Sequence, residues 1–226
     1  QWGYAKIMHY DLSRSITVTA RVKQGYTAAQ INSQIKAWLS EQAGSWPPNY
    51  SFEQGGYEEN TQENMAAVIK YLPLSGCIIL LLLIIQFNSM RKTGMVIATI
   101  PLGIIGVVIG LLVFRSYFGF MGFLGVISLA GIVINNAIVL IDRIGIEQTE
   151  FNKEPAQAVV DACSQRFRPI LLTTFTTTFG LIPLYLGGGS MWEPMAVSIM
   201  VGLLFGTTIT LLFIPALYSV LYRVKI

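Results

Sequence analysis

Five long segments of this sequence carry no charged side chain, and they restrict the possible fold more than any other feature. No Asp, Glu, Lys or Arg occurs in residues 71–87, 93–114, 117–141, 169–187 and 194–222, and Lys70 lies directly before the first of these segments. A helix needs roughly 20 apolar residues to cross a bilayer, and each segment is near or above that length once Met65–Ile69 extend the first. Residues 65–226 therefore predict an α-helical polytopic membrane bundle of five transmembrane helices. These predicted helices span about 65–87, 93–114, 117–141, 169–187 and 194–222.

The composition is that of a membrane protein rather than a soluble one. Hydrophobic residues make up 53% of the chain and charged residues only 12%, whereas a soluble domain carries about a quarter charged residues. The net charge of +3 is too small to indicate nucleic-acid binding, so no nucleic-acid partner is expected. The sequence has no phosphate-binding loop, no nucleophile beside a base and no metal-ligand cluster. Neither an enzyme nor a cofactor site is therefore expected.

Residues 1–64 are polar and predict a small α+β domain before the membrane part. Hydrophobic and polar residues alternate over Ser15–Lys23, which predicts a strand with one buried face. A helix is expected from Thr27, and Tyr50–Gln54 predicts a second strand, so the expected order is βαβ. Two strands and one helix cannot bury a stable core, so we expect partners from elsewhere in the polypeptide or from another subunit. Because the chain begins with Gln1 rather than Met, we interpret its start as a boundary within a longer polypeptide.

The positions of Lys and Arg predict how the helices cross the membrane. If residues 1–64 lie outside, the short outside loops contain only Arg115. The inside loops and the C-terminal end then contain Arg91, Lys92, Arg143, Lys153, Arg166, Arg168, Arg223 and Lys225. Because inside loops carry the excess of positive charge, we expect residues 1–64 on the extracytoplasmic side and the C-terminus in the cytoplasm.

One inside loop has a pattern of its own, at about 155–167. Its apolar residues recur on one helical face, and Arg166 and Arg168 follow at the C-terminal end, where cations suit the helix dipole. We interpret it as a cytoplasmic amphipathic helix that lies on the inner membrane surface. An ordinary linker helix is the alternative.

Polar residues within the predicted membrane helices are the strongest candidates for function. Asn135 and Asn136 lie near the middle of the third helix, and Thr173 belongs to a threonine cluster in the fourth. Polar side chains in a bilayer need internal partners, so they usually face a helix bundle or a water-filled cavity. The Asn pair therefore indicates a functional site, with hydrogen bonding between helices as the alternative. The threonines can also bond to carbonyls of their own helix.

Several motifs resemble the permease subunits of the resistance-nodulation-division (RND) superfamily, in particular hydrophobe/amphiphile multidrug efflux pumps of the acriflavine-resistance type. These motifs are Gln86–Ser89, Pro101–Gly106, Gly131–Asp142, Arg166–Thr173, Trp192–Met195 and Pro215–Tyr218. Each motif is modest alone, but their order and spacing make the set specific. Together with residues 1–64, the resemblance covers nearly the whole chain.

The resemblance implies that this chain is the C-terminal part of a permease that works as a homotrimer. The five predicted helices would be the last five of the permease, and residues 1–64 the closing, ferredoxin-like half of a periplasmic porter subdomain. The implied activity is drug/proton antiport, in which H⁺ enters down the proton motive force and small amphiphilic substrates leave. The implied location is a Gram-negative bacterial inner membrane. The implied partners are the lipid bilayer, the remainder of the permease chain, a periplasmic adaptor protein and an outer-membrane channel.

In this family a proton relay centres on an aspartate pair in a helix that the chain does not contain. The resemblance implies that Asn135 stands where the best-known members have a lysine facing that pair, and that Asn136 matches a neighbouring asparagine. Thr173 would match a threonine beside the relay, and Arg166 an arginine at its cytoplasmic end. Because Asn135 offers hydrogen bonds but no charge, the hypothesis is that Asn135, Asn136 and Thr173 hydrogen-bond the aspartates and the water between them.

Two other functions stay open at the level of sequence. A membrane subunit of the same superfamily that assists protein translocation also has a small periplasmic domain followed by five helices, with an Asn-containing motif in a similar place. A truncated membrane protein without transport activity is the third alternative. An upstream half that carries the aspartate pair would distinguish the antiporter from both.

Overall fold

The computed structural model of the chain describes residues 7–20, 28–53, 55 and 57–223. The chain divides into two compact units, Gln1–Ser51 and Phe52–Ile226. In the described residues, both strands belong to the first unit, and the second consists almost entirely of helices.

The first unit contains a short β-hairpin and one helix. β1 (Met8–Tyr10) and β2 (Ser13–Ser15) pair antiparallel. Asp11 and Leu12 connect them with φ values of 45° and 61°, the left-handed backbone of a two-residue type I′ turn. α1 (Ala28–Ala43) follows. The predicted helix is confirmed from Ala28 onward, and its predicted start at Thr27 lies outside the described residues.

The order of these elements differs from the predicted βαβ. Residues 16–20 and 50–53 contain no strand, and the other residues of the two predicted strands, 21–23 and 54, lie outside the described part. Ile16 and Val18, whose alternation with polar residues predicted a strand, are 86% and 89% exposed. A strand forms only where a neighbouring strand supplies hydrogen-bond partners, and the described part of the first unit supplies none to this segment.

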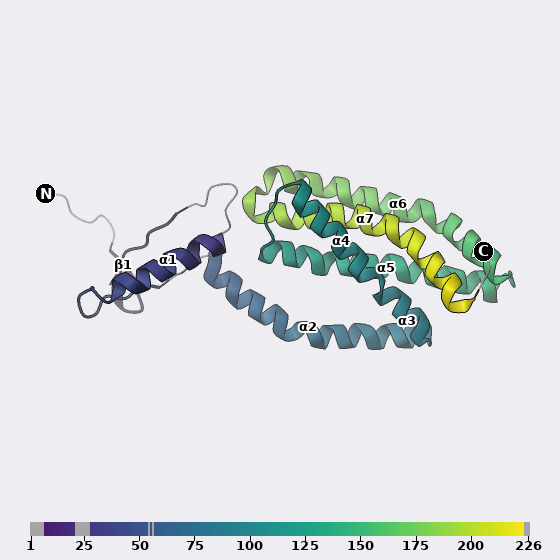
Figure 1. Ribbon diagram of the computed structural model, residues 1–226, viewed down its shortest axis with the longest axis horizontal. Coiled ribbons are helices and arrows are strands. Elements are labelled where there is room, and N and C mark those ends of the chain that lie inside the picture. Colours follow the sequence, from purple (N-terminus) through teal and green to yellow (C-terminus); the bar gives the residue numbers. More distant parts are fainter. Residues whose placement is uncertain (1–6, 21–27, 54, 56, 224–226) are drawn as a thin grey trace. The chain divides into compact units, whose positions relative to one another are not determined.

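The second unit is a helical bundle (Figure 1). Its helices are α2 (Tyr57–Phe87), α3 (Met90–Ile97), α4 (Thr99–Val113), α5 (Phe120–Thr149), α6 (Pro155–Gly187) and α7 (Gly189–Tyr222). Five stretches in the described residues are long and apolar enough to cross a membrane. They are Glu63–Phe87, Met90–Val113, Phe120–Thr149, Pro155–Gly187 and Met191–Tyr222. The prediction of five membrane helices is thus confirmed.

The second of these stretches consists of two helices. Ala98 separates α3 from α4, and its backbone N–H donates to the Gly94 carbonyl over 3.0 Å. Pro101 explains the interruption, because proline has no N–H to donate to the carbonyl of Ile97, four residues earlier. A proline is tolerated in the first turn of α4, because the N–H groups of a first turn have no acceptor within the helix.

α6 is one continuous helix, in contrast to the predicted amphipathic helix at 155–167 followed by a separate span at 169–187. Pro155 occupies its first turn, and Pro169 lies inside it. A proline inside a helix removes one backbone hydrogen bond but keeps a helical φ, and packing holds the two parts together here. Ala158, Val159 and Ala162 are buried, so one face of this segment packs against the bundle, and its place at the inner membrane surface stays a prediction.

α7 is the central helix of the second unit and contacts α4, α5 and α6. Glycines allow α4 and α7 to come close together. A Cβ atom at Gly106 would lie 2.7 Å from the Phe205 Cβ and 3.1 Å from the Gly202 Cα, and one at Gly206 would lie 3.3 Å from the Gly103 Cα. The spacing Gly106–Gly110 and Gly202–Gly206 is thus used for close helix packing, as in other membrane helix pairs.

Two groups of buried apolar side chains form the core of the second unit. One contains Val107 of α4, Leu129 and Val133 of α5, and Leu203 of α7. The other lies nearer the C-terminal ends of α5 and α7 and is built around Leu140, Ile144, Val159, Ile214 and Tyr218. α5 and α7 contribute to both groups. The predicted site residues lie on α5 and α6.

Candidate functional site

The predicted site residues on α5 are accessible in the described chain. Asn135 is exposed and Asn136 is half-buried, whereas Val133 and Ala137, on either side of the pair, are fully buried. The asparagines therefore occupy the edge of the helix that faces away from the core. Among the residues that the structure describes, neither amide takes part in a side-chain hydrogen bond.

The predicted site residues on α6 also lie at or near its accessible side. Thr173 is exposed, and its hydroxyl donates to the Ile170 carbonyl over 2.9 Å. Arg166 is half-buried, and its Nε atom has no hydrogen-bond partner among the described residues. The structure therefore places all four predicted residues on two neighbouring helices but joins none of them to another by a hydrogen bond within the described chain.

A buried hydroxyl pair on the other side of α6 was not predicted. The Thr174 and Thr207 hydroxyl oxygens lie 3.0 Å apart and join α6 to α7. Both side chains are buried at 2% exposure. Thr174 directly follows the exposed Thr173, so adjacent threonines of one cluster have different environments.

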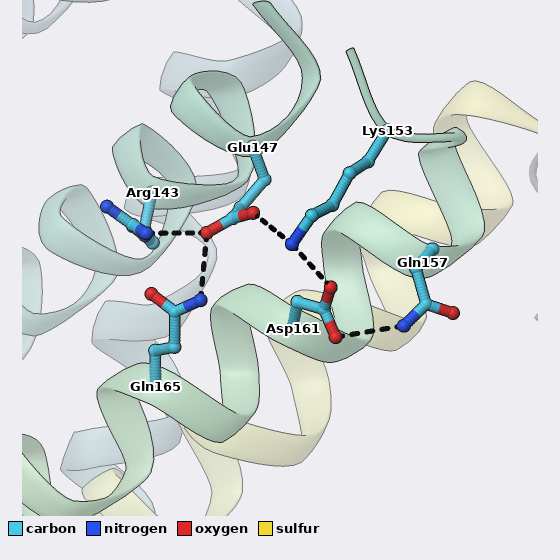
Figure 2. Close-up of polar contacts among 6 residues, drawn as sticks. All are labelled: Arg143, Glu147, Lys153, Gln157, Asp161 and Gln165. Carbon is cyan, nitrogen blue, oxygen red and sulfur yellow. Dashed lines mark hydrogen bonds and ion pairs between the residues drawn. The ribbon is translucent and has the colours of Figure 1, made fainter. Parts of the chain in front are cut away.

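A second polar region, also missed from the sequence, lies where α5 ends and α6 begins (Figure 2). Its centre is Glu147, which is only 1% exposed. The Glu147 Oε1 atom accepts hydrogen bonds from Arg143 over 2.6 Å and from Gln165 over 2.9 Å. Its Oε2 atom lies 2.7 Å from the Lys153 Nζ atom. Three polar groups thus surround one buried carboxylate.

Lys153 extends this network to a second carboxylate. Its Nζ atom donates to the Asp161 Oδ2 atom over 2.7 Å, and Gln157 donates to the Asp161 Oδ1 atom over 2.9 Å. We call the six residues Arg143, Glu147, Lys153, Gln157, Asp161 and Gln165 the elbow network. It contains two cations and two carboxylates, so its charges balance.

Local sequence explains how the elbow network forms. Glu147 continues the buried stripe of α5, which runs through Val133, Ala137, Leu140 and Ile144 at helical spacing. In the loop after α5, the Lys153 backbone N–H donates to the Glu147 carbonyl over 3.3 Å. This bond folds the loop back and brings the Lys153 side chain to the carboxylate. The helical spacing of the stripe was the sequence signal that could have identified Glu147 as buried.

The neighbouring carboxylates favour the charged form of Lys153. Its hydrogen bonds to Asp161, and then to Glu147, raise the pKa of the Lys153 ammonium above its ordinary value. The Arg143 guanidinium and the Lys153 ammonium also lie 5.7 and 5.6 Å from the ring centre of Phe151, which is exposed in the same loop. Cations at this distance are attracted to an aromatic face, so Phe151 helps to keep both side chains at the elbow.

Comparison with known proteins identifies relatives along nearly the whole chain. The profile of the AcrB/AcrD/AcrF family matches residues 1–222. Multidrug resistance protein MdtC of Salmonella paratyphi C (strain RKS4594) is 28% identical over 233 residues, covering 100% of this chain and 22% of that protein. Swarming motility protein SwrC of Bacillus subtilis (strain 168) is 33% identical over 183 residues, covering 79% of this chain and 17% of that protein.

The fold also matches a solved transporter structure. The crystal structure of a heavy metal efflux pump (crystal form II) has a TM-score of 0.68 and 26% sequence identity, over 88% of this chain and 20% of that chain. This chain therefore spans about a fifth of the length of the relatives it matches.

Proposed function

Because the chain belongs to the AcrB/AcrD/AcrF family of RND transporters, we propose that it works as the C-terminal part of a proton-driven multidrug antiporter. The observation that carries this proposal is the family match over residues 1–222, which includes both the first unit and all five candidate membrane helices. The chain is a multi-pass membrane protein homologous to efflux transporters, not to enzymes. Proton coupling and drug export are the parts that we add.

The proposed setting follows from the resemblance of the motifs to RND efflux permeases. We place residues 1–64 in the periplasm, as part of a porter subdomain, and residues 65–226 in a Gram-negative inner membrane with the C-terminus in the cytoplasm. The working unit is a homotrimer that engages a periplasmic adaptor protein and an outer-membrane channel. The Salmonella relative is named a multidrug resistance protein, which supports the proposal that the substrates are small amphiphilic molecules.

Asn135 and Thr173 support a polar site that is completed by protein beyond this chain. Both are exposed within helices of membrane-spanning length, and a polar side chain is costly against hydrocarbon. We therefore infer that protein and water, rather than lipid, cover this part of α5 and α6. The family relay supplies the partner: a pair of aspartates carried by another part of the permease.

Asn135 and its neighbours suit such a partner. The Asn135 Nδ2 group can donate to an ionised carboxylate, and its Oδ1 atom can accept from a protonated one, so the amide can bond to both states. It supplies no positive charge. Asn136 and Thr173 add hydrogen bonds. Arg166, whose Nε atom has no hydrogen-bond partner among the described residues, would lie at the cytoplasmic end of the relay.

Replacement of Asn135 in the complete native polypeptide tests the proposal. In cells that express it, Asn135→Ala is expected to reduce uncoupler-sensitive dye export roughly tenfold or more, since a hydrogen bond to a charged group contributes about 1.5–3 kcal/mol. Ser128→Ala, on an exposed position of the same helix, is the matched control and is expected to export dye normally. Undiminished, uncoupler-sensitive export by Asn135→Ala would contradict the assigned site.

The solved structural relative gives a second candidate cargo, because it is a heavy metal efflux pump. The same cells can therefore be challenged with heavy-metal salts. One outcome is that the parent protein protects cells from a metal salt but exports no dye, and that Asn135→Ala loses this protection. Metal ions would then replace amphiphilic drugs as the proposed cargo. The proposed coupling site would remain the same.

A further inference from the structure

We propose that Glu147 is a positioning residue for transport, which sets the register between α5 and α6. It does so by holding the end of α5 to the beginning of α6 through the elbow network. These two helices carry Asn135 and Thr173, so this inference rests on the proposed function. It assigns to Glu147 no contact with protons in transit or with cargo.

Burial makes Glu147 dependent on its partners. At 1% exposure, the carboxylate has lost nearly all contact with water, and an ion in that position is strongly destabilising unless charged and polar partners replace the water. Arg143 lies on the same helix and contributes nothing to the link between helices. The link between α5 and α6 therefore comes from the partners that reach across to Glu147, which are Gln165 and Lys153.

Glu147 is connected to α6 by two routes (Figure 2). Gln165 of α6 donates directly to its Oε1 atom over 2.9 Å. Lys153 of the loop lies 2.7 Å from its Oε2 atom and 2.7 Å from the Asp161 Oδ2 atom of α6. Both routes end on a single polar edge of α6, because Gln157, Asp161 and Gln165 recur every four residues.

This arrangement is specific for one register of the two helices. A slip by one helical turn moves a side chain by about 5.4 Å, which is more than the length of any bond in the network. Such a slip would separate Glu147 from Gln165 and break the bridge that Lys153 forms between Glu147 and Asp161, so the buried carboxylate would keep its pairing with Arg143 but lose its connection to α6. The network therefore selects one relative position of α5 and α6 along their axes.

The register reaches the proposed transport site along the helices. Asn135 precedes Glu147 by twelve residues, and α5 contains no proline between them; at 1.5 Å per residue this is about 18 Å. Thr173 follows Gln165 by eight residues, or about 12 Å. A displacement at the elbow is thus transmitted along α5 to Asn135 and along α6 to the segment that precedes Thr173.

Pro169 divides α6 into a first part that contacts the elbow network and a second part that carries Thr173. It lies between Gln165 and Thr173 inside α6 and cannot donate a backbone hydrogen bond to the Gln165 carbonyl. α6 can therefore bend at this point, and its first part is held by the elbow network. We infer that Glu147 fixes the base from which the threonine-bearing part of α6 extends.

The test uses Glu147→Gln in the complete native polypeptide, reconstituted in liposomes. This variant keeps the size of the side chain but loses the charge that Lys153 pairs with. Glu150→Gln is the matched control, because it makes the same change three residues later at an exposed position. Asp161→Asn, which weakens only the route through Lys153, provides a milder second variant should Glu147→Gln fail to fold.

Two measurements are made on each variant. The first is the distance between nitroxide labels at Ser128→Cys of α5 and Thr176→Cys of α6, both exposed positions, with the native cysteines replaced by serine. The second is proton-gradient-driven dye transport. We expect the parent and Glu150→Gln to give the same narrow distance distribution. Glu147→Gln is expected to broaden or shift it and to lower transport several-fold, and Asp161→Asn to do both to a smaller extent.

An unchanged distance distribution in Glu147→Gln and Asp161→Asn would overturn the inference at any transport rate. A changed distribution with full transport would also overturn it, because the register would then be irrelevant to the activity. Failure of the proposed function has a different signature: the parent protein itself would show no gradient-driven transport, while the label distances would still report whether Glu147 sets the register.

Discussion

Thr174 and Thr207 show how individual polar side chains are accommodated inside this bundle. Their hydroxyl oxygens are 3.0 Å apart between α6 and α7, in a position with 2% exposure for both residues. A buried hydroxyl without a partner loses its hydrogen bonds to water and gains nothing in return. The two threonines therefore satisfy each other and contribute a polar contact to an otherwise apolar interface.

Valine substitutions at this pair are expected to be non-additive. Thr207→Val keeps the side-chain shape but removes the partner of Thr174, which is expected to lower the free energy of unfolding by about 1 kcal/mol. Thr174→Val/Thr207→Val removes both hydroxyls and is expected to cost less than the sum of the two single substitutions. Unfolding of the purified protein in detergent, followed by circular dichroism, measures both. Strict additivity would show that the hydroxyls do not interact.

Helix α7 packs against α4 through glycines, and this contact determines how the elements of the second unit fit together. At Gly106 a Cβ atom would lie 2.7 Å from the Phe205 Cβ, which is too close for any real side chain. A Cβ atom at Gly180 of α6 would meet no atom within 4 Å among the described residues, apart from its own helix backbone and chain neighbours. Two glycines in membrane-length helices thus have opposite tolerance for a methyl group.

Alanine substitutions distinguish these two glycines. Gly106→Ala is expected to lower the free energy of unfolding by about 1–3 kcal/mol, because α4 and α7 must separate to admit the methyl group. Gly180→Ala is the control and is expected to leave stability unchanged or to raise it, since alanine favours helix over glycine by about 1 kcal/mol. The midpoint of thermal unfolding in detergent checks both. Equal midpoints for the two variants would contradict close packing at Gly106.

The helices were predictable from the sequence, but their ends and their polar contacts were only partly so. Absence of charge identified the five membrane segments. The same criterion placed the end of the third segment at residue 141, whereas α5 continues to Thr149. Arg143 and Glu147 pair with each other and remain in the helix. The sequence predicted separate helices at about 155–167 and 169–187, whereas α6 runs from Pro155 to Gly187 with Pro169 inside it.

Contacts between residues that are not neighbours in the sequence explain the remaining differences. Alternation at Ile16 and Val18 predicted a strand, but a strand depends on a neighbour that local sequence cannot supply. Glu147 followed the apolar stripe of α5 at helical spacing, so its burial was predictable. Its ion pair with Lys153 was not, because that contact depends on the fold of the loop between α5 and α6. The assignment of Asn135, Asn136, Thr173 and Arg166 to a proton relay stays a prediction.

At the scale of the whole molecule, both units leave apolar surface uncovered in the described chain. In the first unit, Ile16, Val18 and Trp38 are largely exposed, and a soluble domain rarely exposes a group of such residues unless another surface covers it. In the second unit, α2 buries little of its apolar surface, which suits contact with lipid. Exposed apolar surface therefore requires contact with protein in the first unit and with a lipid bilayer in the second.

The distribution of charge predicts the orientation of the molecule across the membrane. Arg115 follows α4, whereas Arg91 and Lys92 begin α3 and the elbow network lies between α5 and α6. If each membrane stretch crosses in the opposite direction to the one before it, with α3 and α4 crossing as one, these charges fall on two opposite sides, with the excess on the side of the elbow. Because the positively charged side faces the cytoplasm, the proposed orientation places Ser51 outside and Glu150 inside.

Cysteine labelling tests this orientation directly. Ser51→Cys and Glu150→Cys, both at exposed positions, are made singly in the complete polypeptide after its native cysteines, Cys77 and Cys163 among them, are replaced. A membrane-impermeant maleimide is expected to label Ser51→Cys in spheroplasts and Glu150→Cys only in inverted membrane vesicles. Labelling of both from the same side, or in the reverse order, would show that the charge distribution does not determine the topology. The proposed entry of protons from the periplasmic side would then have the wrong direction.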